Sequence, residues 1–308
     1  MAVLRTPDAC FDTLPGYRFE PHYLTVEHPR QGKVRMHYLD EGPKDAPVAL
    51  LLHGEPTWSF LYRKMIPVIA AAGFRAVAPD YPGFGRSDKL PDREDTTYGG
   101  IVAQVRSAVE QLDLQRAVLV GQDWGGPIGL RVLSEVPDRF AAALMTNTLL
   151  PTCEPPPRGV AGWPGPIIEP WVKLCTESDD LPVSQIVAGT FVTPPDPAVL
   201  AAYDAPFPDK RYKSAVLAIT TRIPLTADYP GVAENKRAWE VLERWTKPFL
   251  TAFSDGDPST KAWEPVFQAR IPGAKGQAHT EIKGAGHFVQ EEAGEALAKV
   301  LVELMRKL

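Results

Sequence analysis

Cysteine is scarce in this chain. The 308 residues contain three, Cys10, Cys153 and Cys175, which are widely spaced and odd in number. None of them falls in a CxxC motif, and no cluster of His, Cys, Asp and Glu has the spacing of a metal site. We therefore expect three free thiols in a reducing compartment, with the cytoplasm as the default location, and no bound metal.

Long apolar runs and an excess of positive charge are also missing. No stretch is long enough to span a bilayer, and residues 1–8 lack the apolar core of a signal peptide. The 38 acidic residues outnumber the 33 Lys and Arg, which gives a net charge of −5. We therefore expect neither nucleic acid nor a membrane surface as a partner.

What the chain does have is a strand–helix alternation typical of an α/β protein with a mostly parallel, doubly wound sheet. Apolar runs or alternating patterns predict strands at residues 34–39, 48–52, 75–78, 117–120, 140–145, 248–253 and 280–282. Helical patterns predict helices at residues 60–72, 101–112, 128–136, 232–245 and 290–306.

The alternation breaks once, in the middle of the chain. Residues 151–166 are rich in proline and glycine, and proline-interrupted helical pieces continue to about residue 229. We therefore predict a core domain made of residues 1–150 and 230–308. Residues 151–229 are predicted to form a helical cap domain inserted in it.

The most informative motif is Gly121-x-Asp123-x-Gly125, which follows the apolar run 117–120 and precedes a helical pattern. This is the strand–turn–helix context of a nucleophile elbow, with aspartate where many hydrolases have serine. A carboxylate in that position can attack carbon and form an ester. Asp123 is therefore the candidate nucleophile.

His287 is the candidate base, since it lies in a glycine-rich loop before the last helix and the order nucleophile, acid, histidine is that of α/β hydrolases. His22, His28, His37 and His279 are interpreted as structural residues on surfaces or strand edges, and His53 as a brace for its own loop. The acid that orients the imidazole is Asp257 or Asp255, both of which follow the strand 248–253. Asn147 occupies the alternative position, but an amide supplies no charge.

Two further residues are expected beside the nucleophile. The loop that begins at His53 follows a central strand, so the backbone N–H groups of Glu55 and Trp124 are candidates for an oxyanion hole. The Glu55 carboxyl has two rival interpretations, a catalytic group that places water and a structural side chain. The indole N–H of Trp124 is only a donor, which suits an anion, although tryptophan more commonly serves packing.

Several motifs together resemble those of haloalkane dehalogenases, in particular the subfamily with an Asp-His-Asp triad and two halide-binding tryptophans. The resemblance runs from Leu4 nearly to the end of the chain, cap included. Its motifs are Leu52-His53-Gly54-Glu55-Pro56-Thr57-Trp58-Ser59, Gly83-Phe84-Gly85-Arg86-Ser87-Asp88, Gln122-Asp123-Trp124-Gly125-Gly126, Tyr203-Asp204-Ala205-Pro206-Phe207-Pro208 and Gly286-His287-Phe288.

This resemblance implies an α/β-hydrolase fold and a reaction in which Asp123 displaces halide from carbon as an alkyl ester. His287, paired with Asp257, would then activate water to hydrolyse that ester, with no organic cofactor. The halide would lie between Trp124 and a cap tryptophan, for which Trp171 is preferred over Trp163. The implied pocket walls are Ile168, Ile219 and Ile223. The implied ligands are a small halogenated alkane and halide, bound by a monomer or a weak homo-oligomer.

The chain departs from this family in a few places. Ser259 and Thr260 follow Asp257 where relatives often carry apolar residues, and Pro127 replaces a bulky apolar residue.

Rival functions share parts of this pattern. An epoxide hydrolase would use the same nucleophile with cap tyrosines, for which Tyr203, Tyr212 and Tyr229 are available. A haloacid-type enzyme would favour a cation where Trp124 stands, and a serine esterase would need serine at position 123. A catalytically silent binding protein remains a further alternative, although such proteins usually lose a triad member.

Overall fold

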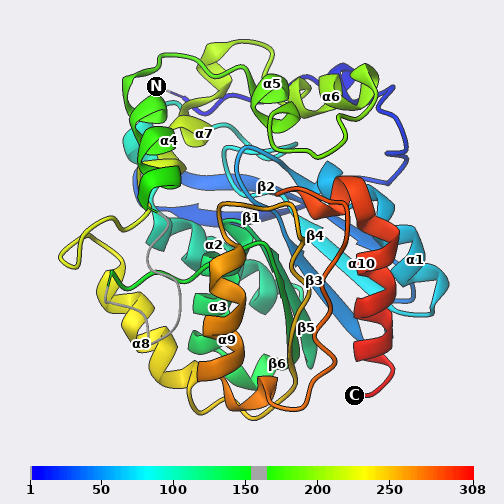
Figure 1. Cartoon of the computed structure of the whole chain (residues 1–308). Helices are drawn as coiled ribbons and strands as arrows, with labels where there is room; N and C mark the ends of the chain where they lie inside the picture. Colours follow the sequence, from blue (N-terminus) through cyan, green and yellow to red (C-terminus); the bar gives the residue numbers. More distant parts are fainter. Residues whose placement is uncertain (1, 154–164) are drawn as a thin grey trace.

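The computed structural model describes residues 2–153 and 165–308. In this part of the chain one mixed sheet of seven strands lies between two layers of helices, and a group of short helices covers one end of it (Figure 1). The strand order is β1-β2-β4-β3-β5-β6-β7. Strand β2 pairs antiparallel with both β1 and β4, and β4, β3, β5, β6 and β7 are mutually parallel.

The strands are β1 (His22–His28), β2 (Gly32–Glu41), β3 (Val48–Leu52), β4 (Arg75–Pro79), β5 (Ala117–Gln122), β6 (Phe140–Thr146) and β7 (Phe249–Thr251). Every residue of β3 and β5 is buried, as expected for central parallel strands that are covered on both faces. These two strands place their carboxyl ends next to each other, because Leu52 pairs with Gly121. The loops carrying Glu55 and Asp123 therefore start side by side.

The helices that flank the sheet are α1 (Ile66–Ala71), α2 (Tyr98–Gln111), α3 (Gly125–Glu135), α8 (Val232–Leu242), α9 (Glu264–Arg270) and α10 (Val289–Met305). Helices α1 and α10 pack together on one side, and α2, α3 and α8 lie on the other (Figure 1). The remaining helices, α4 (Gly165–Glu177), α5 (Val183–Ala188), α6 (Pro197–Asp204) and α7 (Ser214–Thr220), gather at the top of Figure 1.

The structure confirms the mostly parallel α/β sheet, and two predicted elements need correction. Residues 60–72 do not form one helix: the 3₁₀-helix η2 (Ser59–Lys64) precedes α1, and Pro67 stands in the first turn of α1. Proline lacks an N–H and disfavours helical backbone before it, so a continuous helix is interrupted there. Residues 280–282 form no strand, since only the bridge between Ser254 and Ile282 is made.

The histidines also differ from their expected positions. His28, in the edge strand β1, and His37, in β2, are both buried rather than on a surface. β1 is not among the predicted strands, and its pairing with β2 makes β2 an internal strand. His37 Nδ1 lies 2.7 Å from Asp80 Oδ2, and His28 Nε2 lies 2.7 Å from the Asp95 carbonyl oxygen. Both remain structural residues.

The three cysteines are unpaired. Among the described residues, no helix is long and apolar enough to cross a membrane.

Candidate active site

Asp123 stands at a sharp turn between β5 and α3. Its φ is +50°, a left-handed conformation that is strained for a residue with a side chain. The flanking glycines make the turn possible: a Cβ on Gly125 would lie 1.9 Å from the Leu52 carbonyl oxygen, and a Cβ on Gly121 2.8 Å from the Gly125 oxygen. The turn thus lifts the carboxylate above the sheet, as the elbow motif predicts.

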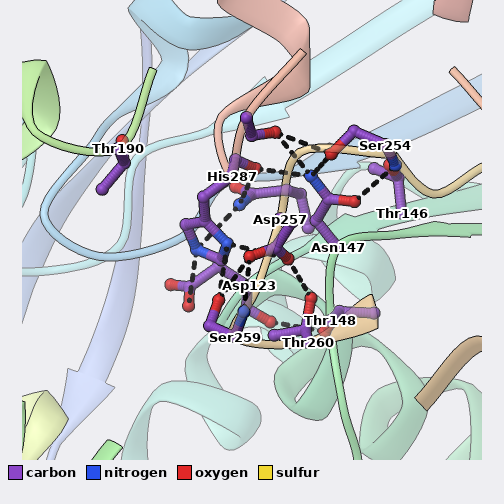
Figure 2. Close-up of polar contacts among 12 residues, drawn as sticks. Asp123, Thr146, Asn147, Thr148, Thr190, Ser254, Asp257, Ser259, Thr260 and His287 are labelled. Atoms are coloured by element: carbon purple, nitrogen blue, oxygen red, sulfur yellow. Dashed lines mark hydrogen bonds and ion pairs between the residues drawn. The ribbon is translucent and has the colours of Figure 1, made fainter. Parts of the chain in front are cut away.

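The imidazole of His287 lies between two carboxylates (Figure 2). Its Nε2 is 3.4 Å from Asp123 Oδ2, and its Nδ1 is 3.2 Å from Asp257 Oδ2. Burial works against the charged imidazolium, but Asp257, followed by Asp123, outweighs it and raises the pKa of His287 to about 10. The three residues therefore form a connected chain of charge and hydrogen bonds.

Asp257, not Asp255, is the acid that the fold brings to His287. Its side chain is fully buried, whereas Asp255 is turned toward the surface and accepts a hydrogen bond from the Gly284 N–H. Burial alone would raise the pKa of Asp257. The charge and hydrogen bond of His287, with the hydroxyls of Ser259 and Thr260, hold that pKa well below its usual range.

The loop of His287 is fixed from several sides, and sequence reasoning missed this. Asn147 does not take the place of the acid: its side-chain N–H₂ donates to the carbonyl oxygens of Gly286 and His287, at 2.9 and 2.8 Å. From the opposite side, the His287 N–H donates to the Thr190 carbonyl oxygen at 3.1 Å. Because Asn147 follows β6 at the same sheet edge as Asp123, its position offered a signal for this bracing role.

Glu55 lies directly across from the nucleophile. Its backbone N–H donates to Asp123 Oδ1 at 2.7 Å, as an oxyanion-hole donor should. Its buried carboxyl accepts a hydrogen bond from the Thr220 hydroxyl at 3.0 Å, and Trp171 lines the same cavity. Burial first, and then the charge of Asp123, raise the pKa of Glu55 well above its ordinary value. This direction favours the protonated, uncharged form of the carboxyl.

The loop that carries Glu55 is braced by His53, as expected from the sequence. His53 Nδ1 lies 2.8 Å from the Gly54 oxygen, and its Nε2 accepts the Tyr81 N–H at 3.3 Å. Burial lowers the pKa of His53, which favours the neutral ring that these two contacts require.

Asp123, Glu55 and His287 open into one cavity of about 430 Å³, with walls from both the sheet end and the helices above it. Trp124, Trp171, Ile168 and Ile223 line it as predicted from the family resemblance. Ile219 does not: it is buried within α7, and Thr220 takes the lining position. Neighbouring helical residues point about 100° apart, so a shift of one residue changes the face. Trp163 lies outside the described residues.

The tyrosines that an epoxide hydrolase would need lie elsewhere in the described structure. Tyr203 donates its hydroxyl to Glu291 Oε2 at 2.6 Å and is fully buried, and Tyr229 hydrogen-bonds the Thr221 oxygen. Neither they nor Tyr212 are among the residues that line the cavity. Tyr98 does line it, but its hydroxyl is committed to Asn235 and the Pro127 oxygen.

Comparison with known proteins agrees with this geometry. Residues 47–294 match the α/β hydrolase fold family. The chain is 48% identical to a haloalkane dehalogenase of Psychrobacter cryohalolentis over 99% of this chain and 98% of that protein. It is 45% identical to a haloalkane dehalogenase of Mycobacterium marinum, over 98% of this chain and 99% of that protein.

A solved structure gives the same result. The haloalkane dehalogenase DpaA from Paraglaciecola agarilytica NO2, described as tetrameric, superposes with a TM-score of 0.87 at 37% identity. The match covers 97% of each chain.

Proposed function

Since this chain belongs to the haloalkane dehalogenase family and is a hydrolase acting on carbon–halide bonds, we propose that Asp123 is the nucleophile of that reaction. The observation that carries the proposal is the unbroken contact from Asp123 through His287 to Asp257. In the first step a carboxylate oxygen of Asp123 attacks the carbon that bears the halogen. The new C–O bond forms as the C–X bond breaks, and the electron pair leaves with the halide.

The departing halide would be held by indole N–H groups. Trp124 and Trp171 both line the cavity, and each supplies one donor and no acceptor. Trp124 is fixed by an edge-to-face contact with Tyr98, whose ring centroid lies 5.3 Å away. The raised pKa of Glu55 favours its uncharged form, which would not repel the anion.

In the second step, water attacks the carbonyl carbon of the Asp123 ester, and His287 Nε2 takes its proton. The backbone N–H groups of Glu55 and Trp124 are proposed to stabilise the oxyanion, and Asp257 the imidazolium. The bond to the alkyl oxygen then breaks, the alcohol leaves with the proton from His287, and Asp123 is regenerated. The balance is one haloalkane and one water giving one alcohol, one halide and one proton.

The two steps are coupled through charge. In the resting site, Asp123 and Asp257 together favour the protonated imidazole. Ester formation removes the charge of Asp123, so one of these two attractions disappears and the pKa of His287 must fall. The base therefore becomes available when the ester that it has to hydrolyse exists.

We propose two domains with different roles. Residues 1–150 and 230–308 form the core that carries the triad, and residues 151–229 form the cap. The cap closes over a small halogenated alkane, with Ile168 and Ile223 as walls.

We also propose a cytoplasmic location and a monomer or weak homo-oligomer. Light scattering on the purified protein tests the latter, and a stable tetramer at nanomolar concentration contradicts it.

The test is halide release from 1,2-dibromoethane and 1-bromobutane by the purified protein. Asp123→Asn should lower release by at least about 10³-fold, because the nucleophile is lost. His287→Phe should still release one equivalent of halide and then hold an alkyl adduct that mass spectrometry places on Asp123. Ser134→Ala, which removes a hydroxyl that donates to the Arg131 oxygen outside the cavity, serves as the control. An adduct on another residue, or none with a substrate that the wild type converts, would refute the assignment.

A further inference from the structure

The carboxylate of Asp257 is held by more donors than a triad acid needs. Besides His287, it accepts the Ser259 N–H at 2.9 Å and the Ser259 hydroxyl at 2.5 Å, both at Oδ1. The hydroxyl of Thr260 donates to Oδ2. The hydroxyls of the consecutive residues Ser259 and Thr260 therefore donate to different oxygens of the buried Asp257 carboxylate (Figure 2).

Ser259 also touches the imidazole itself. Its Oγ lies 3.2 Å from His287 Nδ1, the same distance that separates Nδ1 from Asp257 Oδ2. When the Ser259 hydroxyl donates to Asp257, its lone pairs face the Nδ1–H. That proton then meets two acceptors, Asp257 and Ser259, which both favour the tautomer with hydrogen on Nδ1. The lone pair of Nε2 is left on the side of Asp123.

From this arrangement we infer that Ser259, assisted by Thr260, is a positioning residue for the hydrolytic half of the reaction. The inference rests on the proposed function. Attack of Asp123 on the haloalkane transfers no proton, so it does not depend on the tautomer or orientation of His287. Ester hydrolysis does, because Nε2 must take a proton from water. A defect at Ser259 is therefore expected in the second step alone.

The experiment is a single turnover with enzyme in excess over 1-bromobutane, quenched at intervals and analysed for bromide, butanol and the butyl-enzyme. In Ser259→Ala, bromide should appear at the wild-type rate within about twofold. Butanol should form about tenfold more slowly, the effect expected for losing a hydrogen bond to a charged group. The butyl-enzyme should accumulate. Ser259→Thr keeps the hydroxyl and should restore butanol formation.

Thr260→Val preserves shape and removes the second donor. It should slow the same step by a smaller factor, since Thr260 holds Asp257 alone, and it provides the test if Ser259→Ala folds poorly. Ser134→Ala should match the wild type in both steps.

Two results would overturn the inference. One is butanol formation at the wild-type rate in Ser259→Ala. The other is an equal slowing of bromide and butanol, which indicates general structural damage. Failure of the proposed function looks different, since the wild type itself would then release no bromide or form no butyl-enzyme.

Discussion

Two carboxyl groups, those of Asp123 and Glu55, open into one cavity, and their surroundings differ. Asp123 faces the imidazolium of His287, whereas the Glu55 carboxyl faces Thr220 and Trp171. Pairs of acids separated in this way are a common means of assigning two roles to one residue type. Here Asp123 is the proposed nucleophile, and the raised pKa of Glu55 favours its uncharged form.

Replacing Glu55 by Gln tests whether its carboxyl only donates and accepts hydrogen bonds. Glutamine is neutral, has nearly the same shape and can keep the bond from Thr220. We expect kcat/KM for 1-bromobutane to change less than about threefold. If Glu55 transferred a proton, the amide would cost roughly 10²-fold or more. Steady-state halide release decides between these outcomes, with Ser134→Ala as the control.

At the scale of elements, a buried ion pair ties three segments together. Both amino groups of the Arg63 guanidinium in η2 donate to the carboxylate of Glu291 in α10, each at 2.6 Å. Tyr203, in α6, donates to the same carboxylate at 2.6 Å. Burial alone would raise the pKa of Glu291, but Arg63 holds it below the ordinary value. The pair therefore stabilises the fold above the ordinary carboxyl pKa and loses that effect as the pH falls through the lowered one.

Breaking this pair should be expensive. Glu291→Gln leaves the Arg63 charge buried without its counter-ion, and such changes cost about 3–5 kcal/mol of unfolding free energy. Glu295→Gln changes an exposed residue of the same helix and should stay within about 0.5 kcal/mol. Urea unfolding at pH 7 measures both. Equal stability of the two variants would show that the pair contributes nothing.

Helices and strands with a clear hydrophobic pattern in their own residues could be predicted from the sequence. Those whose formation depends on contacts with distant segments could not. Continuous apolar runs predicted β3 to the residue and β5 to within two residues. The elbow depends on glycines within two positions of Asp123, so it was also readable. In contrast, β1 is an edge strand of mixed exposure, and its burial alternates only over its last four residues, Thr25 to His28.

The candidate site shows the same division. Asp123 and His287 could be named from their motifs and their order in the chain, whereas the choice of Asp257 over Asp255 came from the family resemblance. The contact between Ser259 and His287 spans 28 residues, and the choice of Thr220 over Ile219 depends on how α7 is rotated. Neither follows from local pattern, because tertiary packing alone determines it.

In the molecule as a whole, the upper helices are attached to the core by hydrogen bonds as well as by packing. The Trp58 indole donates to the Ala202 oxygen at 3.2 Å, and the Thr6 hydroxyl to the Pro206 oxygen at 2.7 Å. The loop after α5 contributes the Thr190 oxygen that holds the His287 backbone. Unfolding of these upper helices would therefore remove a hydrogen bond that positions the backbone of His287.

The raised pKa of His287 predicts how the stability of the whole molecule depends on pH. The pKa of His287 is raised to about 10 in the folded protein, from 6.5 for an unperturbed histidine. Between these values the folded state holds a proton that the unfolded state has released, so unfolding free energy must fall as pH rises. The contribution is complete below pH 6.5 and is lost by about pH 10.

Urea unfolding of the wild type and of His287→Phe from pH 6 to 10 isolates this effect, because other groups titrate in both proteins. The stability difference between them should shrink with rising pH, by at most about 1.4 kcal/mol per pH unit. Asp123→Asn removes one of the two carboxylates that favour the imidazolium, so the pKa of His287 should be lower in this variant. The fall in unfolding free energy with rising pH should therefore be complete at a lower pH than in the wild type. A difference that stays constant over this range would mean that His287 is neutral in the resting site. The charge coupling between the two chemical steps would then be wrong.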